Sequence, residues 1–234
     1  DGNSTICDDE TIPALSVTVG AGEKVSWYDA VAGGTLLLMD STTYTPTTAG
    51  IYYAETYVEE SGCVSSRTAV ELTIVAIPNA PISDGDFTIC DDDTIPNLSV
   101  RGSGTENVSW YNAATGGTLL LMDSTTYTPT AAGIYYAEAY VDGTPCASTR
   151  TAVELIIVAT PNAPISDGDI TICEDDTIPS LSVTIGGTEK VSWYSEATGG
   201  TLVLMDSETF TPTVEGIYYA EVYIEGIDCM SPRT

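Results

Sequence analysis

The stretch SWYNAATGGTLLLMDSTTYTPTAAGIYYAE, residues 109–138, has near-copies at equal distances before and after it in the chain. The tryptophans of the three copies, Trp27, Trp110 and Trp193, are separated by 83 residues each time, and the cysteines keep the same interval. Solenoid repeats are about 20–50 residues long, whereas a unit of this size can enclose a core of its own. The sequence therefore predicts three tandem domains, with boundaries at residues 1–79, 80–162 and 163–234.

The composition excludes several classes of partner. The chain has six Lys and Arg residues against 34 Asp and Glu, a formal net charge of −28. Such a charge repels nucleic acid and anionic membrane surfaces. No apolar run reaches the roughly 18 residues that indicate a membrane helix. The expected partners are therefore the neighbouring repeats of the same chain, with neither nucleic acid binding nor direct membrane insertion.

Alternating apolar and polar residues dominate each repeat, as in half-buried strands. Glycine pairs at Gly33–Gly34 and Gly116–Gly117 are turn signals between two such strands. About seven short strands per repeat predict an all-β fold, a two-sheet antiparallel sandwich. The residues expected to point inward are Leu15, Val17, Val19, Val25, Trp27, Val70, Leu72, Ile74, Tyr218, Ala220, Val222 and Ile224.

The segment Thr48–Ala54 has the spacing of an immunoglobulin-type tyrosine corner, with Tyr52 as the corner residue. The position two residues later is alanine in all three copies, so the inter-sheet disulfide of antibody domains is absent. The third copy ends at Thr234, before a segment that matches AVELTIVA. The predicted fold is therefore three tandem immunoglobulin-like antiparallel β-sandwich repeats of 83 residues, the third truncated.

Two cysteines per repeat indicate disulfides and an oxidising, extracellular compartment. Zinc is disfavoured because the chain has no histidine. If the chain folds back near Pro13, Cys7 lies at the same end of the sandwich as the loop that holds Cys63. This favours pairing within a repeat over pairing of Cys63 with Cys90, which would join corresponding ends of successive domains. The predicted disulfides are Cys7–Cys63, Cys90–Cys146 and Cys173–Cys229.

The pattern WYDAVAGGTLLL, WYNAATGGTLLL and WYSEATGGTLVL precedes a threonine-rich strand, then GIYYAE, and a late cysteine before SSRTAVELTIV. It resembles the immunoglobulin-like repeats of large surface proteins of Bacteroidota bacteria, and it covers all three copies. The resemblance implies export to the cell surface in an adhesin or another giant protein, some of which are linked to gliding. Short Asp-Ser/Thr patterns also look like the O-glycosylation pattern of these bacteria, with acceptors at Ser41, Thr94, Ser124 and Thr177.

Acidic residues cluster at the start of each repeat. Hard oxygen ligands near a linker are what calcium requires, and a bound ion would stiffen the joint. The competing interpretation is a solvated acidic surface, and no other cofactor is required. The predicted calcium ligands are Asp84, Asp86, Asp91, Asp92, Asp93, Asp167, Asp169, Asp175 and Asp176.

Tyrosines and glutamates alternate along the GIYYAE strand, where they would share its outer face. Aromatic rings beside carboxylates can hold sugars, but such residues are more often cross-strand pairs that stabilise a sheet. The residues concerned are Tyr53, Glu55, Tyr57, Tyr136, Glu138, Tyr140, Tyr219, Glu221 and Tyr223.

The chain is not expected to be an enzyme, because no nucleophile with a base, no acid and base pair and no metal centre is recognisable. The favoured function is a structural spacer or stalk of a cell-surface adhesin or filament, about 100–130 Å long if the strands lie along its axis. The alternative is an adhesive module that binds a glycan or a protein. Copies of the chain could also associate laterally or head to tail.

The missing last strand of the third repeat leaves an unpaired edge that something must cover. We expect a chain extended through an AVELTIVA-like segment to be a soluble monomer whose third domain is as stable as the second. Polymerisation of the extended chain would instead indicate subunits of a donor-strand fibre.

Overall fold

The computed structural model describes residues 2–234, and their only regular elements are β-strands. The chain divides into two compact units, and strands of the second repeat contribute to both. No segment within residues 2–234 forms a helix able to cross a membrane. The units comprise residues 1–83, 100–125 and 135–152, and residues 84–99, 126–134 and 153–234.

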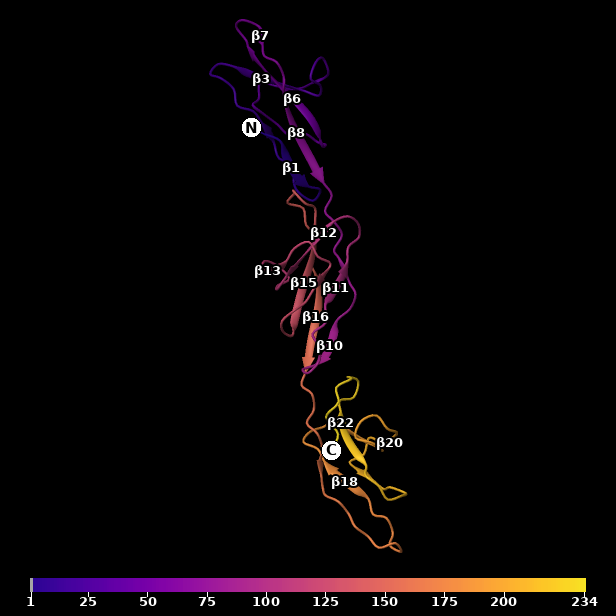
Figure 1. Ribbon diagram of the computed structural model, residues 1–234. Helices are drawn as coiled ribbons and strands as arrows, with labels where there is room; N and C mark the ends of the chain where they lie inside the picture. The colour runs from indigo at the N-terminus through magenta and orange to yellow at the C-terminus, as the bar shows by residue number, and fades with distance from the viewer. Residues whose placement is uncertain (1) are drawn as a thin grey trace. The chain divides into compact units, whose positions relative to one another are not determined.

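The first repeat is a sandwich of two sheets. Strands β1, β3, β6, β7 and β8 of the larger sheet are labelled in Figure 1. The larger sheet has the order β1-β8-β6-β3-β4, with β7 paired to β6, and the smaller sheet pairs β2 with β5. The strands are β1 (Ser4–Cys7), β2 (Leu15–Ser16), β3 (Lys24–Tyr28), β4 (Leu36–Met39), β5 (Thr43–Tyr44), β6 (Gly50–Val58), β7 (Cys63–Val64) and β8 (Thr68–Val75).

The second repeat has the same arrangement. One sheet has the order β10-β16-β15-β12-β13, and the other has the order β14-β11-β9. The strands are β9 (Ile82–Ser83), β10 (Phe87–Cys90), β11 (Leu98–Arg101), β12 (Asn107–Tyr111), β13 (Leu119–Leu121), β14 (Thr126–Tyr127), β15 (Gly133–Tyr140) and β16 (Thr151–Val158).

The third repeat has two sheets of three strands, β17-β18-β21 and β20-β19-β22. Its strands are β17 (Ile165–Ser166), β18 (Leu181–Thr184), β19 (Lys190–Tyr194), β20 (Leu202–Met205), β21 (Thr209–Phe210) and β22 (Tyr219–Tyr223). It has no counterpart of β8 or β16, as the sequence predicts.

One strand pairing differs from the antiparallel expectation. The first strand of a repeat lies alongside its last strand in parallel: Ser4 pairs with Leu72, and Cys7 pairs with Val75. In the second repeat β10 and β16 pair in the same way, with Cys90 opposite Val158. Each of these first cysteines therefore lies at the end of the sandwich where the chain leaves for the next repeat.

The core lies between the two sheets, where the sequence places it. In the first repeat Val25, Trp27, Val70 and Leu72 are buried together with Leu15, and Val17, Val19 and Ile74 pack against them partly exposed. The third repeat buries Ala220 and Val222 in the same way, with Tyr218 against them. The predicted inward faces of these strands are confirmed for these residues.

The loops use the predicted turn chemistry. Gly33 and Gly34 have φ values of 61° and 75°, in the left-handed region that a side chain disfavours. Tyr52 donates a hydrogen bond from its hydroxyl to the Thr48 carbonyl at 2.8 Å, which confirms the tyrosine corner.

Candidate functional site: the disulfide junctions between repeats

The disulfides join successive repeats. Cys7 of the first repeat is bonded to Cys146 of the second, with Cα atoms 5.4 Å apart, and Cys90 of the second is bonded to Cys229 of the third, at 5.6 Å. All four residues are buried. The predicted pairing within repeats, Cys7–Cys63, Cys90–Cys146 and Cys173–Cys229, is therefore wrong.

The parallel pairing of β1 with β8 explains the error. Cys7 lies opposite the end of β8, whereas Cys63 precedes the start of β8. The eight residues of β8 span about 25 Å, and the Cα atoms of a disulfide lie within about 7 Å of each other. The expected fold-back near Pro13 would have placed the two cysteines at one end, and the pairing with β8 places them at opposite ends.

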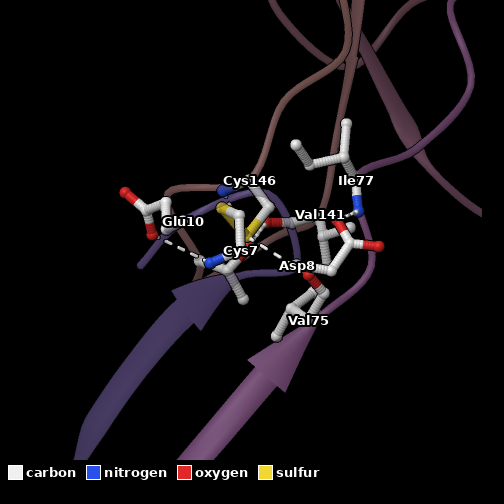
Figure 2. Close-up of a disulfide and its surroundings, with 8 residues drawn as sticks. Cys7, Asp8, Glu10, Val75, Ile77, Val141 and Cys146 are labelled. Carbon is white, nitrogen blue, oxygen red and sulfur yellow. Dashed lines mark hydrogen bonds between the residues drawn. A yellow bond between two sulfur atoms is a disulfide. The ribbon is translucent and has the colours of Figure 1, made fainter. Parts of the chain in front are cut away.

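Hydrogen bonds of backbone amides fix the first junction around its disulfide (Figure 2). The Asp8 amide donates to the Val75 carbonyl at 3.0 Å, and the Ile77 amide of the linker donates to the Asp8 carboxylate at 3.1 Å. On the other side, the Val141 amide donates to the Cys146 carbonyl at 3.0 Å. Both the cysteine loop and the outgoing linker are thus fastened at the point of the cross-link.

An acidic residue three positions after the cysteine closes the loop that presents it. The Cys7 amide donates to the Glu10 carboxylate at 2.9 Å, and the Glu10 amide donates back to the Cys7 carbonyl at 3.1 Å. Asp93 closes the loop of Cys90 in the same way, also at 2.9 and 3.1 Å. One part of each acidic cluster therefore has a structural role in presenting a cysteine.

The second junction fastens its linker more firmly than the first. Asp91 accepts a hydrogen bond from the amide of Thr160 at 2.8 Å. The Thr160 hydroxyl lies 2.7 Å from the carboxylates of both Asp91 and Asp92, which share its one proton. The bonds from the Thr160 amide and hydroxyl hold the pKa of Asp91 below its usual range.

The pKa of Asp91 is lower in the folded chain than in the unfolded chain. The stabilisation from its contact with Thr160 is therefore fully present above about pH 4, the usual pKa of an aspartate, and is lost as the pH falls through the folded pKa. A carbon-13 NMR titration should place the Asp91 midpoint below that of an exposed aspartate. Thr160→Val keeps the amide donor and loses the hydroxyl, so it should raise the midpoint part of the way. An ordinary midpoint in the unaltered chain would contradict this assignment.

Cys63 and Cys173 are exposed thiols without a disulfide partner in the described chain. Their loops nevertheless match those of the bonded cysteines. The Cys173 amide donates to Asp176 at 2.9 Å, as Cys7 does to Glu10. Cys63 of β7 pairs with Val58 of β6. In the second repeat Val141, the equivalent of Val58, donates to the carbonyl of Cys146, the equivalent of Cys63.

The predicted calcium ligands are spread over several local hydrogen bonds. Asp84 accepts from the Ser99 hydroxyl at 2.7 Å, Asp86 from the Glu154 amide at 2.8 Å, and Asp167 from the Thr184 hydroxyl at 3.2 Å. Asp169 and Asp175 are exposed. Within residues 2–234 no three Cys, Asp or Glu side chains are gathered as metal ligands. Calcium binding stays a prediction that a calcium titration would test.

The tyrosine and glutamate residues of the GIYYAE strand are largely engaged in contacts within their own repeats. The hydroxyls of Tyr57, Tyr140 and Tyr223 donate to Asp40, Asp123 and Asp206, and these hydrogen bonds raise the pKa of each tyrosine. The glutamates, Glu55, Glu138 and Glu221, are ion-paired with arginines.

Among the predicted glycosylation sites, Thr94 and Thr177 are exposed, and Ser41 and Ser124 are half-buried.

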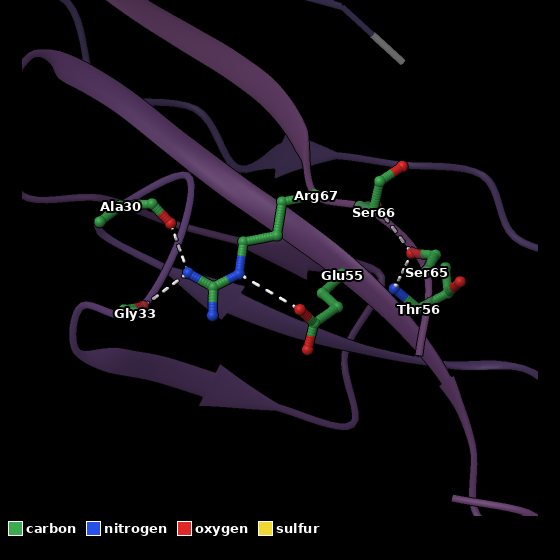
Figure 3. Close-up of polar contacts among 7 residues, drawn as sticks. All are labelled: Ala30, Gly33, Glu55, Thr56, Ser65, Ser66 and Arg67. Carbon is green, nitrogen blue, oxygen red and sulfur yellow. Dashed lines mark hydrogen bonds and ion pairs between the residues drawn. The ribbon is translucent and has the colours of Figure 1, made fainter. Parts of the chain in front are cut away.

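Each repeat contains an arginine cluster that was not predicted from the sequence, and Figure 3 shows the cluster of the first repeat. The Arg67 side chain pairs with Glu55 at 3.3 Å and donates to the carbonyls of Ala30 and Gly33. Its guanidinium also lies 3.5 Å from the centre of the Tyr28 ring. The cluster ties the Gly33–Gly34 turn to the start of β8.

The same cluster recurs around Arg150 and Arg233. Among only six basic residues, three arginines share the 83-residue interval of the tryptophans. This recurrence at the repeat interval could have identified the three arginines from the sequence as structurally equivalent residues. A side chain with so many partners inside one repeat holds its loop in place.

No curated protein matches the chain. Among solved structures, it is similar to extracellular domains 3–5 of OTK from Drosophila (13% identity over 96% of this chain and 90% of that chain, TM-score 0.36). It is also similar to immunoglobulin domains 1–4 of Sidekick-1 (16% identity, 100% and 72%, TM-score 0.34) and to murine CEACAM1b (14% identity, 66% and 96%, TM-score 0.38).

A family model described as "Ig-like domain CHU_C associated" matches residues 1–75, 78–158 and 161–234. The three matches are consistent with the predicted resemblance to the repeats of Bacteroidota surface proteins. Together with the two-sheet topology and the tyrosine corner they establish the fold class. The chain therefore belongs to the CHU_C-associated Ig-like domain family, in three tandem copies.

Proposed function

We propose that the chain is a load-bearing spacer in a cell-surface adhesin or filament, with disulfides that reinforce each junction between repeats. The observation that carries the proposal is the bonding of Cys7 and Cys90, the first cysteines of the first two repeats, to the second cysteine of the following repeat. Disulfides persist in oxidising, extracellular compartments, in keeping with a surface location. The chain acts without catalysis and requires no cofactor.

The disulfides shorten the covalent route along the chain. In the oxidised chain a pulling force passes from Cys7 to Cys146, back along the second repeat to Cys90, and across to Cys229. That route has six residue steps before Cys7, 56 between Cys146 and Cys90, and five after Cys229, which makes 67 in all. The route along a reduced chain of 234 residues has 233 steps. Even a fully unfolded array therefore stays short.

Single-molecule stretching between the two ends tests the proposal. Reduction should lengthen the fully unfolded chain by 166 residue steps, the difference between 233 and 67, or about 580 Å at about 3.5 Å per residue. Cys146→Ser should lengthen the oxidised route to 94 steps, 89 before Cys90 and five after Cys229. An extension that reduction leaves unchanged would overturn the proposal.

Cys63→Ser is the matched control, because Cys63 has no disulfide partner in the described chain. The extension of this variant should equal that of the unaltered oxidised chain. A longer extension would mean that Cys63 takes part in a disulfide, and non-reducing peptide mapping of the unaltered chain would identify its partner. An adhesive role on the tyrosine face is not favoured, because the glutamates there are ion-paired with arginines.

A further inference from the structure

A lysine bridges two carboxylates on the surface of the first repeat. The Lys24 ammonium lies 2.6 Å from the Glu59 carboxylate and 3.9 Å from the Asp40 carboxylate. The hydroxyl of Tyr57, which pairs with Lys24 across β3 and β6, donates a hydrogen bond to the same Asp40 carboxylate. The lysine therefore offsets one of two negative charges that are gathered beside this tyrosine.

The third repeat has the same arrangement. Its ammonium belongs to Lys190, which lies 3.0 Å from the Glu225 carboxylate and 3.8 Å from the Asp206 carboxylate. Two of the three repeats thus show a primary ammonium group held at the same place, between equivalent carboxylates.

The second repeat keeps both carboxylates and lacks the lysine. By the 83-residue equivalence Asn107 stands at the position of the lysine, and the two carboxylates are those of Asp123 and Asp142. Among residues 2–234 neither carboxylate is ion-paired with a lysine or an arginine. The hydrogen bond to Asp123 raises the pKa of Tyr140 most, and the charge of Asp142 raises it further, so both carboxylates act on one hydroxyl.

The backbone presents Asp123 as it presents the equivalent carboxylates. Asp123 has a φ of 56°, against 57° for Asp40 and 59° for Asp206, a left-handed conformation that is uncommon for residues other than glycine. The Tyr140 hydroxyl donates to Asp123, as the equivalent tyrosines do in the other repeats. The first half of the pair of carboxylates is therefore in place without its cation.

The turn that carries Asp142 also matches its counterpart in the third repeat. The Thr144 amide donates to the Val141 carbonyl at 3.2 Å, and the equivalent bond, from Ile227 to Ile224, has the same length. Asp142 therefore occupies the place that Glu225 has in the third repeat. Both Asp142 and Asp123 are exposed, so a ligand can reach them from solvent.

We propose that Asp123, Asp142 and Asn107 bind the primary ammonium group of a lysine side chain that belongs to a partner molecule. Asparagine is shorter than lysine, so the outer part of the space that the lysine fills in the other repeats is open. An ammonium group has three donors, and the two carboxylates and the Asn107 amide oxygen supply three acceptors. Calcium fits this set less well, because it takes about six to eight oxygen ligands.

The partner is a basic protein rather than a second copy of this chain. The two lysines of the chain, Lys24 and Lys190, are already paired within their own repeats. The net charge of −28 attracts a basic partner and repels a further copy.

The probe is Nα-acetyl-lysine amide, which carries the lysine side chain and no other charge. Added to the chain of residues 1–234, it should shift the carboxyl carbon signals of Asp123 and Asp142 and the side-chain amide signal of Asn107 in NMR spectra. The shifts should saturate with a dissociation constant of about 10 mM, because exposed ion pairs are individually weak. The equivalent carboxylates of the other repeats should not respond, and the uncharged Nε-acetylated probe should shift no signal.

Two substitutions exchange the conditions of the first and second repeats. Asn107→Lys supplies the ammonium from within the chain and should abolish the response of the second repeat. Lys24→Asn removes the ammonium from the first repeat and should create a second site of similar affinity at Asp40 and Glu59. Because the Lys24 side chain is 39% exposed, its replacement should leave the repeat folded.

Three results would overturn the proposal. The first is the absence of saturable shifts, or equal shifts at acidic residues throughout the chain, which would indicate only a diffuse layer of counterions. The second is an unchanged response in Asn107→Lys, which would place the probe elsewhere. The third is a response of the same signals to calcium but not to the lysine probe, which would assign the carboxylates to a metal ion.

Discussion

Replacement of Trp27 by alanine is expected to destabilise the first repeat by about 3–5 kcal/mol. The Trp27 side chain is fully buried, and Leu15, Val25 and Leu72 belong to the same core cluster. Its indole also donates a hydrogen bond to the Ser41 carbonyl at 3.0 Å. The substitution removes the largest side chain of the core and leaves a cavity that two paired sheets cannot readily close.

Native-state hydrogen exchange, read peptide by peptide, would measure the loss in the first repeat separately from the others. Trp27→Phe should cost less, because it keeps a ring and loses the hydrogen bond. Val31→Ala is the surface control, since Val31 is 66% exposed, and it should change the stability by less than about 0.5 kcal/mol. Equal effects of Trp27→Ala and Val31→Ala would contradict the assignment of Trp27 to the core.

Replacement of Arg150 by methionine is expected to cost the second repeat about 3 kcal/mol, because it leaves the Glu138 carboxylate poorly solvated and without its ion-pair partner. The side chains of this pair are only 10% and 18% exposed, and the Arg150–Glu138 distance is 2.9 Å. Arg150 also donates to the Ala113 and Gly116 carbonyls, both at 2.7 Å, so the turn at Gly116 loses its attachment.

Lys190→Met provides the comparison for Arg150→Met. Lys190 pairs with Glu225 at 3.0 Å, but the two side chains are 34% and 73% exposed, so solvent screens the pair and its loss should cost much less than the loss of Arg150. Adding Glu138→Gln to Arg150→Met should recover part of the stability, because the unpaired charge is removed. Chemical denaturation followed by hydrogen exchange would measure each value, and equal costs for the arginine and the lysine would refute the structural role of the cluster.

The sequence by itself determined the repeat, the fold class and the core. Alternation assigned residues such as Val70 and Ala220 to the buried face, because a strand turns successive side chains to opposite sides. The spacing of Tyr52 from Thr48 predicted the tyrosine corner for a similar reason, since the contact is local. These features depend on neighbours within a few residues, which a single sequence displays directly.

Tertiary structure decided the disulfide pairing and the arginine clusters. Both depend on which distant segments lie side by side. Because β1 pairs with β8 in parallel, Cys7 and Cys63 lie at opposite ends of their repeat. Cys7 instead lies within bonding distance of Cys146, 139 residues away. Equal spacing in the sequence allows pairing within a repeat and pairing between repeats alike. Only the direction of one short strand selects between them, because a disulfide cannot span the length of a sandwich.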